Sequence, residues 1–204
     1  MKLIKELSIK LYNWILSFSK SRYSFLALFI FALSEAIFFP IPPDLLLITL
    51  ILGSRNDAMK YAVYCTLGSI IGGSLGYLIG YHLWWDGDSF TPIANYFFTN
   101  IPFFTMDVFL TIKNMFDEHG FLIIFTAGFT PIPYKIFSIS AGINNISFAT
   151  FVLASIISRS LRFFIIAILL YKFGNKIENI IKNNFNILSI LITVFLIFIY
   201  LSIK

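Results

Sequence analysis

Charge is scarce in this sequence. Only 12% of its 204 residues are charged, while 58% are hydrophobic. A soluble domain is normally about 25% charged and about 45–50% apolar, so this composition excludes an ordinary soluble fold. The 15 basic residues outnumber the 10 acidic ones, but they are scattered around apolar segments. That scatter is typical of membrane-protein loops and not of a nucleic-acid-binding surface. We therefore expect one polytopic membrane domain with no nucleic-acid partner.

Several chemical signatures are also missing. One cysteine, Cys65, cannot form an internal disulfide. There is no Walker loop and no dinucleotide fingerprint. His82 and His119 lie at segment ends, without metal-ligand partners at suitable spacing. We therefore expect no cofactor and no metal site.

Glycines follow one face of an apolar segment. The stretch "GGSLG" (72–76) matches the pattern of a hydrolase nucleophile, but that motif needs a strand, a turn and a helix in succession. Glycines at every fourth position let two helices approach closely, so we expect helix packing and no catalytic residues. The packing positions are Gly68, Gly72, Gly76 and Gly80.

The apolar runs divide the chain into segments. We expect an interfacial amphipathic helix at 1–22, a hairpin at 24–52, a transmembrane helix at 61–84, an exterior loop at 86–118, a second hairpin at 120–143, a transmembrane helix at 147–173 and a further one at 186–203.

A short repeat interrupts two of these segments. "FFPIPPDLL" (38–46) and "FTPIPYKIF" (129–137) share the pattern F-x-P-I-P. Proline breaks a helix, and the freed backbone groups cannot face lipid. Each segment must either span the membrane with a break or turn back as a re-entrant hairpin. The prolines expected to form these breaks are Pro40, Pro42, Pro43, Pro131 and Pro133.

Loop charges favour the re-entrant alternative. With a cytoplasmic N-terminus, that arrangement keeps Arg55 and Lys60 inside and leaves few basic residues outside. The two hairpins then enter from opposite faces, and each is followed by a transmembrane helix. The predicted fold class is an all-α polytopic membrane protein built as an inverted repeat, the plan of many secondary transporters.

Five ionisable residues remain inside apolar segments. They are Glu35, Asp44, Lys135, Arg159 and Arg162. Asp44 could simply be a first-turn acid on a helix that starts at the prolines. The two arginines share one helix face and could form structural ion pairs with the acids. Three cations against two acids instead favour a bound anion, and replacing either arginine with glutamine should then leave a folded, inactive protein.

The motifs resemble those of a known family. Glu35 is followed by F-F-P-I-P-P-D, then a glycine-rich segment, then G-F-T-P-I-P-Y-K and S-R-x-x-R-F-F. This order, over residues 24–174, is similar to the DedA family of bacterial inner-membrane proteins, and in particular to its YqaA-type branch. The resemblance implies two facing re-entrant hairpins and proton-coupled recycling of undecaprenyl phosphate, with Glu35 and Asp44 matching the essential membrane acids. The second motif departs from the main DedA pattern, which has an arginine before and another after the proline. In this sequence Thr130 stands near the first of these positions and Lys135 near the second.

Three functions remain as hypotheses. The leading one is a transporter or flippase for a phosphorylated lipid carrier, without covalent chemistry and coupled to protons. The second is a structural or envelope-homeostasis membrane protein whose buried charges only stabilise the fold. The third is an intramembrane lipid-phosphate enzyme, which would need a nucleophile and a base. We expect membrane lipid and an anionic lipid-phosphate headgroup as partners, a possible homo-oligomer, and a multi-pass location in the bacterial inner membrane.

Overall fold

The structure, a computed structural model, describes residues 23–37, 42–101, 105–130 and 132–174. The helices expected at 1–22 and 186–203 lie outside the described residues, as do Pro40 and Pro131.

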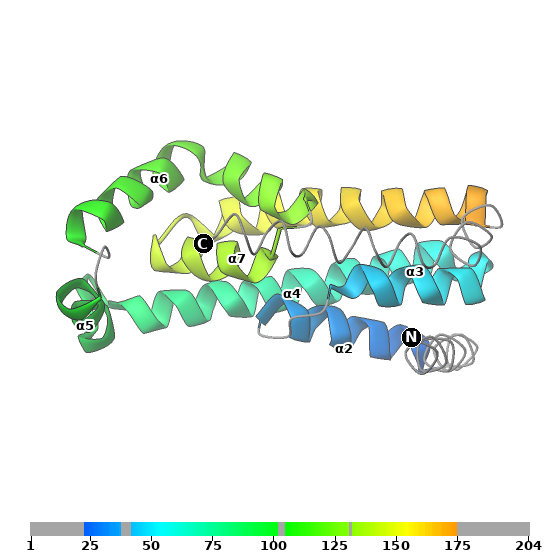
Figure 1. The fold of residues 1–204 in the computed structure, drawn as a ribbon, viewed down its shortest axis with the longest axis horizontal. Coiled ribbons are helices and arrows are strands. Elements are labelled where there is room, and N and C mark those ends of the chain that lie inside the picture. Colours follow the sequence, from blue (N-terminus) through cyan, green and yellow to red (C-terminus); the bar gives the residue numbers. More distant parts are fainter. Residues whose placement is uncertain (1–22, 38–41, 102–104, 131, 175–204) are drawn as a thin grey trace, which may run out of the picture.

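Two long antiparallel helices form the axis of the molecule. The first, α4, spans Ala58–Trp84 and follows a short 3-10 turn, η1, at Arg55–Asp57. The second spans Phe148–Gly174, and Figure 1 shows it running beside α4 in the opposite direction. Both are long and apolar enough to cross a membrane. At 1.5 Å per residue, their 27 residues extend about 40 Å, more than the hydrocarbon core of a bilayer.

A pair of shorter helices packs at one end of this axis. Helix α2 (Ser24–Ile37) runs parallel to α4, with Ser24 Oγ 3.0 Å from the Tyr61 hydroxyl. Helix α3 (Pro43–Gly53) then returns toward the end where α2 began (Figure 1). Its first residue is Pro43. Proline suits this position because the N–H groups of the first helical turn have no hydrogen-bond partner within the helix, so the missing N–H of proline costs nothing there.

A second pair packs toward the other end. Helix α6 (Met106–Phe129) has a kink at His119, and its second half runs beside the first part of the helix Phe148–Gly174. Helix α7 (Tyr134–Ile143) turns back and packs on the second half of α4 (Figure 1). The two helix pairs therefore approach the middle of the molecule from opposite ends. The all-α class expected from the sequence is confirmed for the described residues, apart from one small hairpin.

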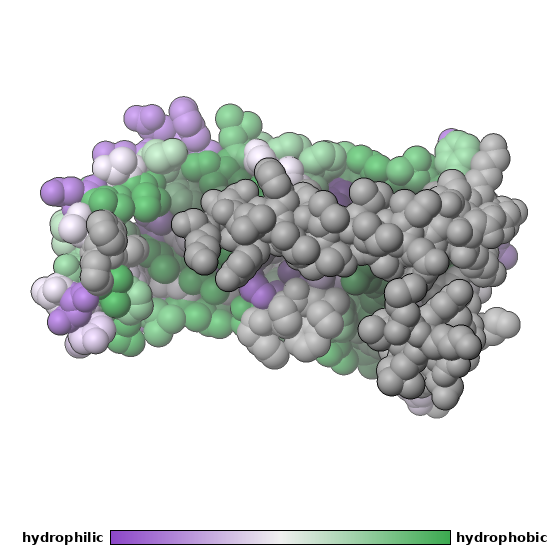
Figure 2. All heavy atoms as spheres, viewed as in Figure 1, coloured by the Kyte–Doolittle hydropathy of each residue, from purple (hydrophilic) through white to green (hydrophobic). Residues whose placement is uncertain are grey.

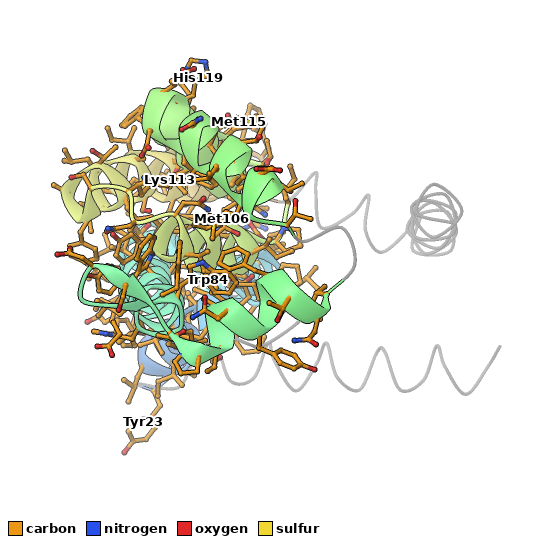
Figure 3. All side chains as sticks on the ribbon, turned by 90° about the vertical axis from the view of Figure 1, so that its left-hand side faces the viewer. Tyr23, Trp84, Met106, Lys113, Met115 and His119 are labelled. Atoms are coloured by element: carbon orange, nitrogen blue, oxygen red, sulfur yellow. The ribbon has the colours of Figure 1, made fainter. Side chains whose placement is uncertain are left out.

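That hairpin lies at the start of the segment 86–118, and the described part of this segment also contains helices. Strands β1 (Trp85–Asp86) and β2 (Ser89–Phe90) turn at Gly87, and α5 (Pro92–Asn100) follows. An aromatic cluster holds these elements against the start of α6, and Figure 3 looks onto this end, with Trp84 between α5 and α6. The sequence led us to expect an exterior loop here, and the aromatic side chains of its described part form a small core. The cluster comprises Trp84, Ala94 and Phe109, with Trp85, Phe90 and Phe98 against it.

The glycine face of α4 lies where other backbones approach closely. A Cβ built on Gly68 or Gly72 would stand 2.3 Å from a carbonyl oxygen of α2, and one on Gly80 would stand 2.1 Å from the Ile139 oxygen of α7. Contacts this short cannot exist with a side chain present. Glycine at these positions therefore lets α4 pack against both helix pairs.

Replacing Gly72 with leucine should destabilise the fold strongly. The new side chain would meet the Leu33 carbonyl, which belongs to a helix backbone and cannot rotate away. Overpacking typically costs about 1–3 kcal/mol, and a backbone clash lies at or beyond the upper end. The melting temperature in detergent measures the effect. Ile71→Leu, on the neighbouring exposed face, is the matched control, and equal melting temperatures for the two variants would contradict this packing.

Apolar side chains cover the outer faces of both long helices. Figure 2 shows hydrophobic residues along these helices, on the face that is visible there. On α4 the exposed residues recur at every third or fourth position, which gives one continuous apolar stripe. Such a surface is typical of contact with lipid. The stripe consists of Val63, Leu67, Ile71, Leu75, Leu78, Ile79 and Leu83.

Candidate functional site

Arg159 lies at the centre of the molecule and is only 2% exposed. Its Nε donates to Ser69 Oγ of α4 at 2.6 Å, and its Nη2 lies 3.5 Å from Glu35 Oε2 near the end of α2. Its Nη1 donates to the Gly128 carbonyl near the end of α6 at 3.5 Å. One guanidinium therefore links the helices that precede the two proline breaks.

Aromatic rings enclose the same guanidinium. Its central carbon lies 4.8 Å from the ring centroid of Tyr134 and 4.8 Å from that of Phe163. The Tyr134 hydroxyl is hydrogen-bonded to Ser155, and the ring lies where a side chain on Gly73 would be. Cation–π contacts stabilise a desolvated guanidinium by about 2 kcal/mol. Tyr134 therefore fixes the position of Arg159 from the start of α7.

Arg162 lies one helical turn further along and also joins the two breaks. Its Nε and Nη2 donate to the two oxygens of Asp44, at 2.9 and 2.7 Å, in a bidentate ion pair. Its Nη1 donates to the Thr130 carbonyl, directly after α6. Both partners of the pair are mostly buried, with side-chain exposures of 14% and 13%. This planar, two-bond geometry is the one in which arginine also binds phosphate.

The helix breaks explain why arginines are needed here. Helix α6 ends at Phe129, so its last carbonyls have no partner within the helix. Buried carbonyls without a partner are costly, and cations at a helix C-terminus interact favourably with the helix dipole. The guanidinium groups satisfy Gly128 and Thr130 in this way. Asp44 lies in the first turn of α3, where an acid interacts favourably with the helix dipole, and it also forms an ion pair with Arg162. Both roles considered for Asp44 from the sequence are therefore compatible with its position.

Lys135 and Glu35 complete the cluster. Lys135 lies in the first turn of α7, where a cation opposes the positive end of the helix dipole. Glu35 is 8% exposed, and the charges of Arg159, Lys135, Asp44 and Arg162 all act on its carboxylate. The five predicted residues thus lie together, with three positive and two negative formal charges.

Sequence reasoning missed several members of this site. Ser69 and Tyr134 were not singled out, although Tyr134 immediately follows the second P-I-P motif. The carbonyls of Gly128 and Thr130 could have been found by asking which backbone acceptors the second break leaves unsatisfied. Among the described residues, no group of three or more His, Cys, Asp or Glu side chains could hold a metal ion.

Comparison with known proteins places the chain among bacterial relatives. The model of the VTT domain matches residues 39–172. An uncharacterized protein of Haemophilus influenzae is 32% identical over 194 residues, which cover 95% of this chain and 96% of that protein. An uncharacterized protein of Histophilus somni is 32% identical over 194 residues, covering 95% and 97%. No solved structure matches. The chain is a membrane protein that belongs to the VTT domain family.

Proposed function

We propose that this protein is a transporter or flippase for a phosphorylated lipid carrier, coupled to protons. The observation that carries the proposal is the cluster of five mostly buried charges between the helices that flank the two proline breaks. Charged groups at the bilayer centre cost about 2.5–3.5 kcal/mol each on insertion scales, and they mark substrate and proton pathways. The repeated P-I-P motif resembles that of the YqaA-type branch of the DedA family, and this resemblance suggests an undecaprenyl-phosphate-like substrate. The second motif lacks the two arginines of that family, and the proposal assigns their charge to Arg159 and Arg162.

The two helix pairs are proposed to be re-entrant hairpins. Helices α2 and α3 enter from the cytoplasm, α6 and α7 enter from outside, and α4 and Phe148–Gly174 cross the membrane. The antiparallel course of α2 and α3, and of α6 and α7, supports this arrangement (Figure 1). The carbonyls freed at the second break can lie at membrane depth because arginines satisfy them.

This arrangement predicts where each loop is exposed. In a Cys65→Ala background, a cysteine at Asn56 should react with a membrane-impermeant thiol reagent only from the cytoplasmic side. A cysteine at Ser89 should react only from outside, and both native side chains are exposed. Labelling intact spheroplasts and inverted vesicles measures the difference. Equal labelling of both positions from outside would contradict the re-entrant arrangement.

Coupling between protons and phosphate follows from the Arg162–Asp44 pair. Asp44 occupies the two donors that a phosphate headgroup would use, so carboxylate and phosphate compete for one guanidinium. Protonation of Asp44 removes its negative charge and releases Arg162 for the headgroup. Each lipid phosphate that enters is then accompanied by a proton, which links its movement to the pH gradient.

Flipping of a labelled polyprenyl phosphate in proteoliposomes tests the function. We expect the wild-type protein to accelerate flipping, and an imposed pH gradient to change the rate. Asp44→Asn should flip at one rate with and without the gradient, because asparagine carries no titratable proton. The control Asp117→Asn alters an exposed carboxylate and should keep the wild-type response. Wild-type protein that leaves the basal flipping rate unchanged would overturn the proposal.

A structural role is the second candidate, and the contacts of the arginines favour it. Arg159 and Arg162 each have an acid partner and a carbonyl partner, so no ligand is needed to satisfy them. In that case charge-neutral variants would lose stability without a selective loss of transport. The intramembrane enzyme would need an accessible nucleophile. Cys65 does not offer one, because its thiol is fully buried within the apolar cluster formed by α2, α3, α4 and the helix Phe148–Gly174.

A further inference from the structure

Helix α5 (Pro92–Asn100) has an apolar side that is exposed. Ile93 and Phe97 are 48% and 37% exposed, and their spacing of four residues places them on one side of the helix, its apolar flank. Asn95 and Thr99 are also exposed, and they form a polar flank on the opposite side, because residues two apart in a helix are about 200° apart around its axis. The nine residues of α5 include no charged side chain. Helix α5 is therefore an uncharged amphipathic helix.

This helix lies across the end of α4. It is seen end-on in Figure 1 and from the side in Figure 3, so its axis crosses that of α4. Thr91, directly before α5, donates its backbone N–H to the Trp84 carbonyl at 3.1 Å and its hydroxyl to the Leu83 carbonyl at 2.6 Å. These bonds hold the start of α5 at the level where α4 ends. With α4 as a transmembrane helix, α5 runs along the membrane surface.

The depth of α5 matches the headgroup layer of a bilayer. Helix α4 is about 40 Å long, and a bilayer with its headgroups is about 40–45 Å thick, so α4 ends among the headgroups. The Phe97 ring lies 5.6 Å from the ring of Trp84, the last residue of α4. At the lower left, where Figure 1 places α5, Figure 2 shows hydrophilic residues on the outer side and hydrophobic ones toward the long helices. The apolar flank therefore faces the hydrocarbon core.

We propose that α5 is an interfacial helix, whose apolar flank inserts between the headgroups and the acyl chains of the leaflet in which α4 ends. The inference rests on the proposed crossing of the membrane by α4 and is independent of transport. Two observations favour lipid as the occupant. The apolar stripe of α4 ends at Leu83, to which Thr91 is bonded, so the flank continues a surface that already faces lipid. Tyr96, 59% exposed, lies between the two flanks, and tyrosine is enriched at membrane–water interfaces.

The charges around α5 indicate which lipid it contacts. Basic residues attract an interfacial helix to anionic lipids, but α5 has none, and two acids, Asp86 and Asp88, precede it. Its binding must therefore come from apolar burial. We assign zwitterionic lipid as the partner of this flank.

Spin labelling of the full chain in phosphatidylcholine nanodiscs tests the proposal. Each label is attached to a single cysteine in a Cys65→Ala background, and power saturation measures its collisions with oxygen and with a polar nickel chelate. We expect oxygen to exceed nickel on the apolar flank, as at the hydrocarbon reference, and nickel to exceed oxygen on the polar flank. Added phosphatidylglycerol should leave this pattern unchanged. The labelled positions, all exposed, are Ile93 and Phe97 on the apolar flank, Asn95 and Thr99 on the polar flank, and Ile71 of the α4 stripe as the reference.

Different results would overturn different parts of the inference. Nickel access at all four positions of α5 would place the helix in water and refute the interfacial assignment. An apolar flank shielded from both reagents would be covered by protein, and spin–spin broadening would identify that protein as a second copy of this chain. A pattern that needs phosphatidylglycerol would refute the choice of zwitterionic lipid. Nickel access at Ile71 would refute the crossing of the membrane by α4, whereas the flipping assay alone decides transport.

Discussion

Arg159→Met should lower stability by about 3–5 kcal/mol, because it leaves the Glu35 carboxylate buried without its cation. The same change removes the donors to Ser69 and to the Gly128 carbonyl, and both of these residues are buried. Thermal unfolding in detergent measures the loss. Among the five cluster residues, we expect this substitution to have the largest effect on the fold.

A second variant separates the lost charge from the lost packing. Removing both charges in Arg159→Met with Glu35→Gln should recover part of the stability, because no uncompensated carboxylate remains. Leu161→Met lies on the exposed face of the same helix and should behave like the wild type. If Arg159→Met unfolded at the wild-type temperature, Arg159 could not be the central structural contact described above.

Lys135→Gln should instead abolish flipping with a smaller effect on stability than Arg159→Met. Lys135 is only half-buried, and its charge opposes the dipole of the helix that it begins. The helix dipole disfavours a cation in that position, whereas a bound anion favours it. We expect the flipping rate to fall at least about tenfold, equivalent to about 1.4 kcal/mol of lost phosphate interaction.

Lys113→Gln is the control for this experiment. Lys113 forms an exposed ion pair with Asp117, 2.9 Å away on the first half of α6, and such pairs contribute about 0–1 kcal/mol. Its removal should leave flipping unchanged. If the Lys135→Gln protein flipped lipid at the wild-type rate, Lys135 would not bind the headgroup. If flipping and thermal stability were both lost to a large extent, the role of Lys135 would be to stabilise the fold.

The sequence revealed the members of the charge cluster but not how they are connected. Prolines and intramembrane charges stand out in an apolar chain, so Glu35, Asp44, Arg159 and Arg162 could be singled out without a structure. Charge counting led us to expect folded, inactive arginine variants. The contacts change this expectation, since each guanidinium also satisfies a backbone carbonyl that only the ended helix leaves free.

Other features depend on long-range packing and leave little trace in composition. We expected an exterior loop at 86–118, and the structure adds that Trp84, Phe90 and Phe109 pack together in one apolar cluster at this end. The spacing of the glycines did indicate close packing, but it could not say that Gly68 and Gly72 face one helix pair while Gly80 faces the other. Which helix packs against each glycine is determined by the tertiary structure and not by the local sequence.

The distribution of charge makes the first and second halves of the described chain complementary and not equivalent. Both acids, Glu35 and Asp44, come from the first half, whereas Lys135, Arg159 and Arg162 all come from the second. Two copies of the first half would bring carboxylates together, and two copies of the second would bring cations together, with several kcal/mol of repulsion. Each half can therefore associate with the other half but not with itself. A gene encoding one half as a symmetric homodimer could not produce this site.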